Sequence, residues 1–102
     1  MMARRPRDKA LEPTASIDRT SYEPAYAQEA LEALLTAGAS QRNRARALVQ
    51  QLCRLPARKG DYHMVDKNGH VWEVLLADNV LLTYRADDAV REVRIATIEW
   101  VD

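Results

Sequence analysis

The spacing of hydrophobic residues predicts a helix early in the chain. Between residues 27 and 35, apolar side chains recur at intervals of three and four, which places them on one helical face. Pro24 suits the first turn of such a helix, and Gly38 suits its end. A helix over this segment would bury one face and expose the other.

The same spacing returns between residues 45 and 53 and predicts a second helix. Ser40 would cap this helix, and Pro56 would stop it. Only about two residues link the two predicted helices. So short a link predicts an antiparallel helical hairpin with one combined apolar face for another layer to cover.

After residue 60 the pattern changes to that of β-strands. Asn68-Gly69 between two β-rich runs is among the best hairpin signals in a single sequence. Tight turns are also predicted at residues 78–79 and 87–88, and strands joined by tight turns are antiparallel. The strands of this four-stranded meander are expected at residues 62–65, 71–76, 80–84 and 90–100.

The last predicted strand changes its inward face along its length. Val93 and Ile95 share one face, whereas Ile98 and Trp100 have the opposite parity. A β-bulge near Ala96 or Thr97 would place all four side chains in the same core.

The N-terminal part offers less hydrophobic patterning. Residues 1–14 are expected to form a disordered basic tail, and residues 16–22 a short first strand. The predicted fold is therefore α+β: a single domain over residues 15–102, with a helical hairpin packed on an antiparallel meander.

Composition narrows the class of protein. The chain has 102 residues, of which 47% are hydrophobic and 29% charged, as in an ordinary globular domain. No apolar run approaches the roughly 18 residues of a membrane helix, and the basic N-terminus lacks the apolar stretch of a signal peptide. We expect a cytoplasmic protein with no membrane partner.

The net charge of zero hides an uneven distribution. Residues 41–60 contain six Lys or Arg and no acid, whereas residues 61–102 contain nine acids and four bases. Two interpretations remain open for the basic block: a solvated helix face, or a surface for a phosphate or an acidic partner. The basic residues of this block are Arg42, Arg44, Arg46, Arg54, Arg58 and Lys59.

For the histidines, the cysteine and the tryptophans, a structural role is the first expectation. His63 and His70 flank the predicted Asn-Gly turn, but two strand histidines are a commoner outcome than a metal site, which needs three or four ligands. Histidine titrates near neutral pH, so His63, close to Arg58, is a candidate acid or base.

Cys53 is expected to be a small buried hydrophobic residue. Trp72 and Trp100 are expected to fill the core between sheet and helices.

From about Ser16 to Asp102 the chain resembles the RelE/ParE superfamily of bacterial toxin–antitoxin toxins. The similarity is carried by the approach to the first helix (22–31) and by the end of the second (52–56). Its clearest part is the paired-strand pattern Trp72-Glu73-Val74-Leu75-Leu76, then 80–88 with Tyr84-Arg85-x-Asp87-Asp88, then 93–95.

The resemblance implies a toxin that a cognate antitoxin holds inactive. RelE-like members cut mRNA in the ribosomal A site, and ParE-like members poison DNA gyrase. The nuclease chemistry needs no metal and no cofactor: a base activates the ribose 2′-hydroxyl, cations stabilise the phosphate, and an acid protonates the leaving oxygen. The resemblance assigns phosphate contact to Arg54, Arg58 and Lys59, with Arg42 and Arg46 of the same basic block as further RNA contacts. Catalysis is expected from His63, Arg58 and Lys59.

The chain departs from the nuclease pattern in two places. Leu81 or a neighbour stands where those members carry an Arg in the penultimate strand, and their C-terminal segment with its Tyr or His has no counterpart before Asp102. The alternative is a gyrase-directed or catalytically silent member of the same fold that binds an acidic protein.

Overall fold

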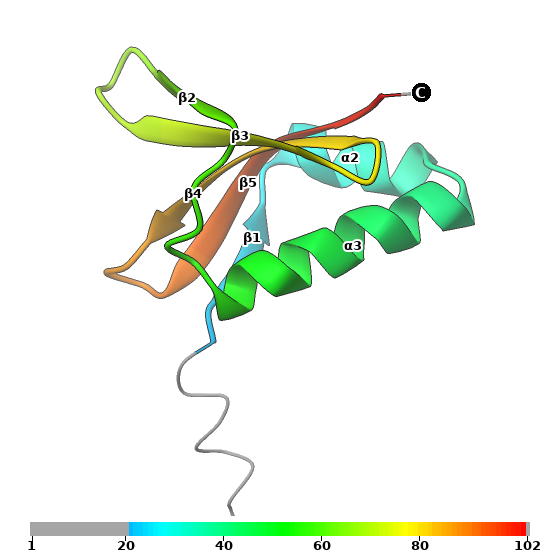
Figure 1. Ribbon diagram of the computed structural model, residues 1–102, viewed down its shortest axis with the longest axis horizontal. Coiled ribbons are helices and arrows are strands. Elements are labelled where there is room, and N and C mark those ends of the chain that lie inside the picture. Colours follow the sequence, from blue (N-terminus) through cyan, green and yellow to red (C-terminus); the bar gives the residue numbers. More distant parts are fainter. Residues whose placement is uncertain (1–20, 102) are drawn as a thin grey trace, which may run out of the picture.

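Five strands form one sheet in the order β1-β5-β4-β3-β2 in the computed structural model, which describes residues 21–101 (Figure 1). The predicted antiparallel meander is confirmed as β2 (Tyr62–Val65), β3 (Val71–Ala77), β4 (Val80–Asp87) and β5 (Glu92–Trp100). Asp78 and Asn79 form the predicted turn between β3 and β4, both with positive φ (53° and 62°). This is the backbone of a two-residue hairpin turn, which Asp and Asn tolerate well.

The first described strand lies later than predicted. β1 (Glu23–Tyr26) runs parallel to β5, with Glu23 opposite Glu92 and Tyr26 opposite Ile95. Pro24 therefore belongs to a strand and not to the first turn of the helix. An edge strand pairs on one side only, so the missing N–H of Pro24 is tolerated there. The predicted tail (1–14) and most of the predicted strand (16–22) lie outside the described residues.

The helical hairpin is confirmed, with a different cap. Helices α2 (Gln28–Thr36) and α3 (Ala39–Arg54) are linked by Ala37 and Gly38 alone. Gly38 is the N-cap of α3, its N–H donating to the Gln41 side chain at 3.4 Å, and the expected cap Ser40 lies inside the first turn. With so short a link, α3 begins directly after Gly38.

The predicted bulge lies at Ala96. Thr83 pairs with Thr97 and Tyr84 with Ile95, so Ala96 has no partner opposite it on β4. The extra residue lets Val93, Ile95 and Ile98 all face the core, where each is at most 5% exposed.

Both helices lie on one face of the sheet, and the core fills the space between these two layers (Figure 1). α3 packs on β1, β4 and β5, and α2 on β1 and β5, whereas the β2–β3 hairpin extends past them. The buried face of α3 consists of Ala45, Leu48, Val49, Leu52 and Cys53. Within residues 21–101 no helix is long and apolar enough to cross a membrane.

The two tryptophans have different surroundings. Trp100 packs against the core as expected. Trp72 does not, because alternation along β3 puts it on the face opposite Glu73 and Leu75, where its indole N–H donates to Asp66 at 2.9 Å. Cys53 is buried as expected, and burial, followed by the charge of Glu23, raises the pKa of its thiol.

Candidate functional site

The loop from Leu55 to Asp61 is tied to β3 by backbone and side-chain hydrogen bonds. Gly60 N–H donates to Glu73 Oε1 at 2.8 Å, and Asp61 N–H donates to the Val74 carbonyl at 2.8 Å. The Asp61 carboxylate in turn accepts the N–H of Leu76 at 2.8 Å. Gly60 lies so close to β3 that a Cβ there would meet the Val74 carbonyl oxygen. A segment without regular structure is thus fixed in position on the sheet.

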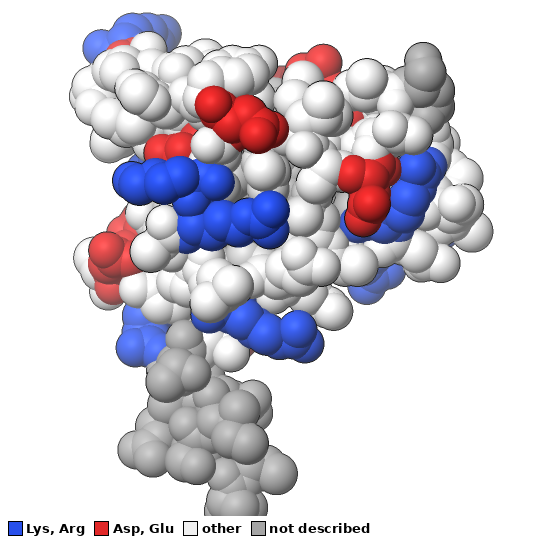
Figure 2. Space-filling model, viewed as in Figure 1, with Lys and Arg blue, Asp and Glu red and all other residues white. Residues whose placement is uncertain are grey.

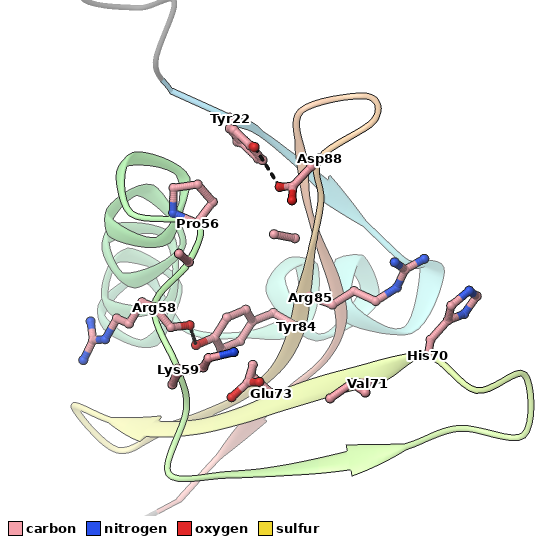
Figure 3. Close-up of a pocket in the computed structure, with 12 residues that line it drawn as sticks. Tyr22, Pro56, Arg58, Lys59, His70, Val71, Glu73, Tyr84, Arg85 and Asp88 are labelled. Carbon is pink, nitrogen blue, oxygen red and sulfur yellow. Dashed lines mark hydrogen bonds between the residues drawn. The ribbon is translucent and has the colours of Figure 1, made fainter.

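A cavity of about 590 Å³ lies between this loop and strands β3 and β4 (Figure 3). We call it the loop–sheet cavity. Its lining residues come from the segment before β1, the loop, β3 with the turn before it, and β4 with the turn after it: Tyr22, Pro56, Ala57, Arg58, Lys59, His70, Val71, Glu73, Tyr84, Arg85, Ala86 and Asp88.

Tyr84 and Glu73 form the middle of the cavity wall. The Tyr84 hydroxyl donates to the carbonyl oxygen of Arg58 at 2.9 Å, which joins β4 to the loop. Burial is the main cause that raises the pKa of Tyr84; Glu73 raises it further, and Arg58 lowers it. Figure 3 shows the Lys59 ammonium group on the same side of the cavity as the Glu73 carboxylate and the Tyr84 phenol. A cation, a carboxylate and a phenol therefore surround one space.

A smaller pocket of about 350 Å³ adjoins this group and contains the predicted acid or base, His63. His63 lies opposite Glu73 in the β2–β3 register, and Lys59 lines both spaces. Of the three residues for which catalysis was expected, Lys59 and His63 thus lie beside Glu73, whereas Arg58 lines only the loop–sheet cavity and its guanidinium points away from Glu73 in Figure 3.

The two histidines do not form a pair across the hairpin. His63 lies opposite Glu73, whereas His70 lies near Asp66, with 3.5 Å between Nδ1 and Oδ2. Nowhere in residues 21–101 do three or more His, Cys, Asp or Glu side chains gather in a way that could hold a metal ion.

The basic block of the sequence divides into separate places. Figure 2 shows basic side chains over the C-terminal end of α3 and the following loop, beside acidic ones. Arg54 is the exposed last residue of α3, next to the loop that carries Arg58 and Lys59. Arg44 donates to the carbonyl of Asp78 at 3.1 Å, in the turn between β3 and β4.

Arg42 and Arg46 line a different space, a groove of about 320 Å³ between the two helices and β1. We call it the helix-pair groove; its apolar lining includes Leu31 and Leu35, which are 44% and 69% exposed. The Arg42 guanidinium also donates to two carbonyls at the end of α2, Leu34 at 3.1 Å and Ala37 at 2.7 Å. Arg42 therefore adds charged hydrogen bonds to the carbonyls at the C-terminal end of α2.

Sequence reasoning missed Glu73 and Tyr84 as site residues. Glu73 is the only charged residue in the run from Val71 to Ala77, and a lone carboxylate in an apolar strand was an available signal. Tyr84 gave no such signal, because an aromatic residue in a strand is expected in the core, and its side chain is indeed 1% exposed.

Comparison with known proteins gives matches in structure only. No family model and no curated protein sequence matches the chain. The toxin–antitoxin complex RelBE from Mycobacterium tuberculosis matches with a TM-score of 0.65 at 18% identity, over 79% of this chain and 92% of that one. The archaeal RelE–RelB complex from Pyrococcus horikoshii matches with a TM-score of 0.61 at 10% identity, over 78% and 94%.

A third structure, the intact RelBE toxin–antitoxin complex of Escherichia coli, has a TM-score of 0.58 at 16% identity. That match covers 80% of this chain and 99% of that one, so it spans nearly the whole of the known domain. The sheet order, the helical hairpin and these matches agree: the chain has the fold of the RelE toxins.

Proposed function

We propose that this chain is the toxin of a toxin–antitoxin pair and that it inhibits translation by cleaving mRNA on the ribosome. The observation that carries the proposal is that Arg58, Lys59, Glu73 and Tyr84 all line the loop–sheet cavity of a RelE-like fold. A carboxylate can act as the base, and cations can stabilise the phosphate, in metal-independent cleavage of RNA.

Each part of that chemistry has a candidate group. A base takes the proton of the ribose 2′-hydroxyl, and the freed oxygen attacks the adjacent phosphorus. The 5′-oxygen of the next nucleotide then leaves with a proton from an acid. Glu73 is suited to the base, His63 to the acid, and Arg58 and Lys59 to the charge on the phosphate. Arg54, beside the loop, extends the positive field along the RNA.

The helix-pair groove is the proposed binding site for the antitoxin. Known RelE proteins are found in complexes with RelB antitoxins. The groove combines exposed Leu31 and Leu35 with the cations Arg42 and Arg46, so it suits an amphipathic helix that carries acidic residues. Apolar contact would supply affinity, and the charges would favour the acidic partner over others.

The proposal is tested by expressing the chain in bacteria from an inducible promoter without any antitoxin. We expect growth arrest, a fall in amino-acid incorporation, and new mRNA 5′ ends at codons in the ribosomal A site. The double variant Arg58→Ala, Lys59→Ala should lose these effects, and Arg44→Ala, which removes a cation outside the cavity, should keep them. Unchanged translation with the folded wild-type chain would contradict the proposal.

A second candidate is a toxin that acts on a protein, such as DNA gyrase. The observation that favours it is the absence of basic residues from this part of the sheet: no Lys or Arg occurs between Lys67 and Arg85, and Leu81 stands near the start of β4. A supercoiling assay with purified gyrase, run beside the mRNA mapping, separates the two candidates. Loss of supercoiling with intact mRNA would favour gyrase.

A further inference from the structure

Strands β3 and β4 separate at one end of the loop–sheet cavity. Their paired register ends at Glu73 opposite Tyr84. Beyond this point Val71 and Trp72 pair only with β2, and residues 85–87 pair only with β5. Because His70, Val71, Arg85 and Ala86 line the cavity, it continues to the place where the two strands part.

Arg85 is held at this place by Trp72. Its guanidinium carbon lies 5.2 Å from the centre of the Trp72 ring, a cation–π distance. The ring is itself fixed, because its N–H donates to Asp66, whose carboxylate also accepts the N–H groups of Asn68 at 2.8 Å and His70 at 3.0 Å. Arg85 is thus preorganised on a rigid aromatic support.

The guanidinium of Arg85 has a hydrogen-bond donor without a partner in the described part of the chain. Its Nε is buried and finds no hydrogen-bond partner among residues 21–101. The acid two residues along the strand, Asp87, instead accepts from Arg94 at 3.1 Å. A buried donor without a partner costs free energy, and an incoming anion would remove that cost.

The two arginines of the cavity lie at its opposite ends. Figure 3 shows Arg85 and His70 at one end and Arg58 at the other, with Tyr84 and Glu73 between them. The two acids of the cavity are each engaged with a donor: Glu73 with Gly60 N–H, and Asp88 with the Tyr22 hydroxyl at 2.7 Å. The cavity therefore has an arginine at each end, with Lys59 beside Glu73 between them.

We propose that Arg85, stacked on Trp72, binds a second phosphate of the same RNA strand, so that the cavity takes at least two successive nucleotides. This inference rests on the proposed function and names how the substrate lies: one phosphate at Arg58 and Lys59, the next at Arg85 with His70 beside it. A guanidinium binds phosphate through two parallel hydrogen bonds, and grooves for single strands combine such cations with aromatic rings.

The test is an NMR titration of the full ¹⁵N-labelled chain at constant low salt with uridine monophosphate, a diuridylate and a triuridylate. In the wild type we expect affinity to rise at least tenfold from the mononucleotide to the triuridylate, with a shift of the Trp72 indole N–H signal. Arg85→Gln should lose most of this dependence on length while it still binds the mononucleotide.

Two further variants make the result specific. Arg44→Gln removes the same charge far from the cavity and should keep the wild-type dependence on length, and Arg58→Ala should weaken the binding of every ligand. If Arg85→Gln and Arg44→Gln give the same affinities, the Arg85 subsite is refuted while RNA binding at Arg58 and Lys59 stands. If no ligand shifts the signals of the cavity in the folded wild type, both the subsite and the proposed RNA function are refuted.

Discussion

The phenol of Tyr84 donates a 2.9 Å hydrogen bond to the carbonyl of Arg58, so a core side chain of β4 holds the backbone of the cationic loop. Tyr84 is 1% exposed, and its ring belongs to the core, whereas its hydroxyl lines the cavity. The packing of the sheet therefore sets where Arg58 and Lys59 stand.

Tyr84→Phe tests this link. The variant keeps the ring in the core and should lower the free energy of unfolding by only about 1 kcal/mol, the usual value of one hydrogen bond. Because the loop loses its hydrogen bond to β4 at Arg58, mRNA cleavage should fall further than this loss of stability explains. Urea unfolding and mapping of mRNA 5′ ends measure the two effects.

Tyr26→Phe is the matched control, because Tyr26 lines the helix-pair groove and not the loop–sheet cavity. Equal activity of the two variants would mean that the bond from Tyr84 does not position the loop.

Gly60 is required by the close approach of the loop to β3. A Cβ at this position would lie closer to three Val74 backbone atoms than van der Waals contact allows, and backbone cannot move aside as a flexible side chain can. Gly60→Ala should therefore destabilise the chain by about 1–3 kcal/mol, as overpacking does, and should lower activity by displacing the loop.

The control for this substitution is Gly38→Ala, where an added Cβ meets nothing within 4 Å. Its cost should stay below about 1 kcal/mol, since only the N-cap preference of α3 is affected. The comparison is made by urea unfolding, and similar costs at both positions would contradict the steric argument.

Asp66 should make the β2–β3 hairpin sensitive to acid. The hydrogen bond from the Trp72 indole N–H, followed by backbone N–H bonds, lowers the pKa of Asp66 from 3.8 to about 2. A carboxyl with a lowered pKa in the folded state contributes stability that is complete above its unfolded pKa and is lost as pH falls toward the folded value. The contribution of Asp66 should thus be present above about pH 4 and decline between pH 4 and 2.

Asp66→Asn should show a smaller loss of unfolding free energy between pH 5 and 2.5 than the wild type. The measurement is urea unfolding followed by tryptophan fluorescence at each pH. Asp78→Asn, at the other hairpin turn, serves as control and should keep the wild-type slope. Identical slopes for Asp66→Asn and the wild type would show that this carboxyl does not titrate at a lowered pH.

The features that the sequence predicts are those with local causes. Helix spacing, the turn at Asp78 and Asn79, and the change of parity around Ala96 each depend on residues close in the chain, and the structure confirms all three. The parallel pairing of β1 with β5 joins Glu23 to Glu92, and no local pattern encodes a contact across so much sequence.

The residues of the candidate site also divide into those that are close in sequence and those that only the fold brings together. Arg58, Lys59 and His63 could be predicted as site residues because they lie close together in the sequence, on the loop and the strand that follows it. Glu73 and Tyr84 join them only through the docking of the loop on β3 and β4, which depends on tertiary hydrogen bonds. Arg42 and Arg44 of α3 were grouped by charge, but their side chains donate to different acceptors.

Arg42 gives the clearest separation of a structural from a binding role. Its guanidinium donates to the carbonyls of Leu34 and Ala37 in a partly buried position at the C-terminal end of α2. Arg42→Ala removes these charged hydrogen bonds and should lower the free energy of unfolding by about 1–3 kcal/mol. Arg46→Ala, one turn along α3 and exposed, should lower the free energy of unfolding by less than about 0.5 kcal/mol.

At a temperature where both variants are folded, Arg42→Ala and Arg46→Ala should bind triuridylate as the wild type does, because neither residue lines the loop–sheet cavity. A stable Arg42→Ala variant with weakened RNA binding would instead return Arg42 to the phosphate-binding residues that the basic block of the sequence suggests.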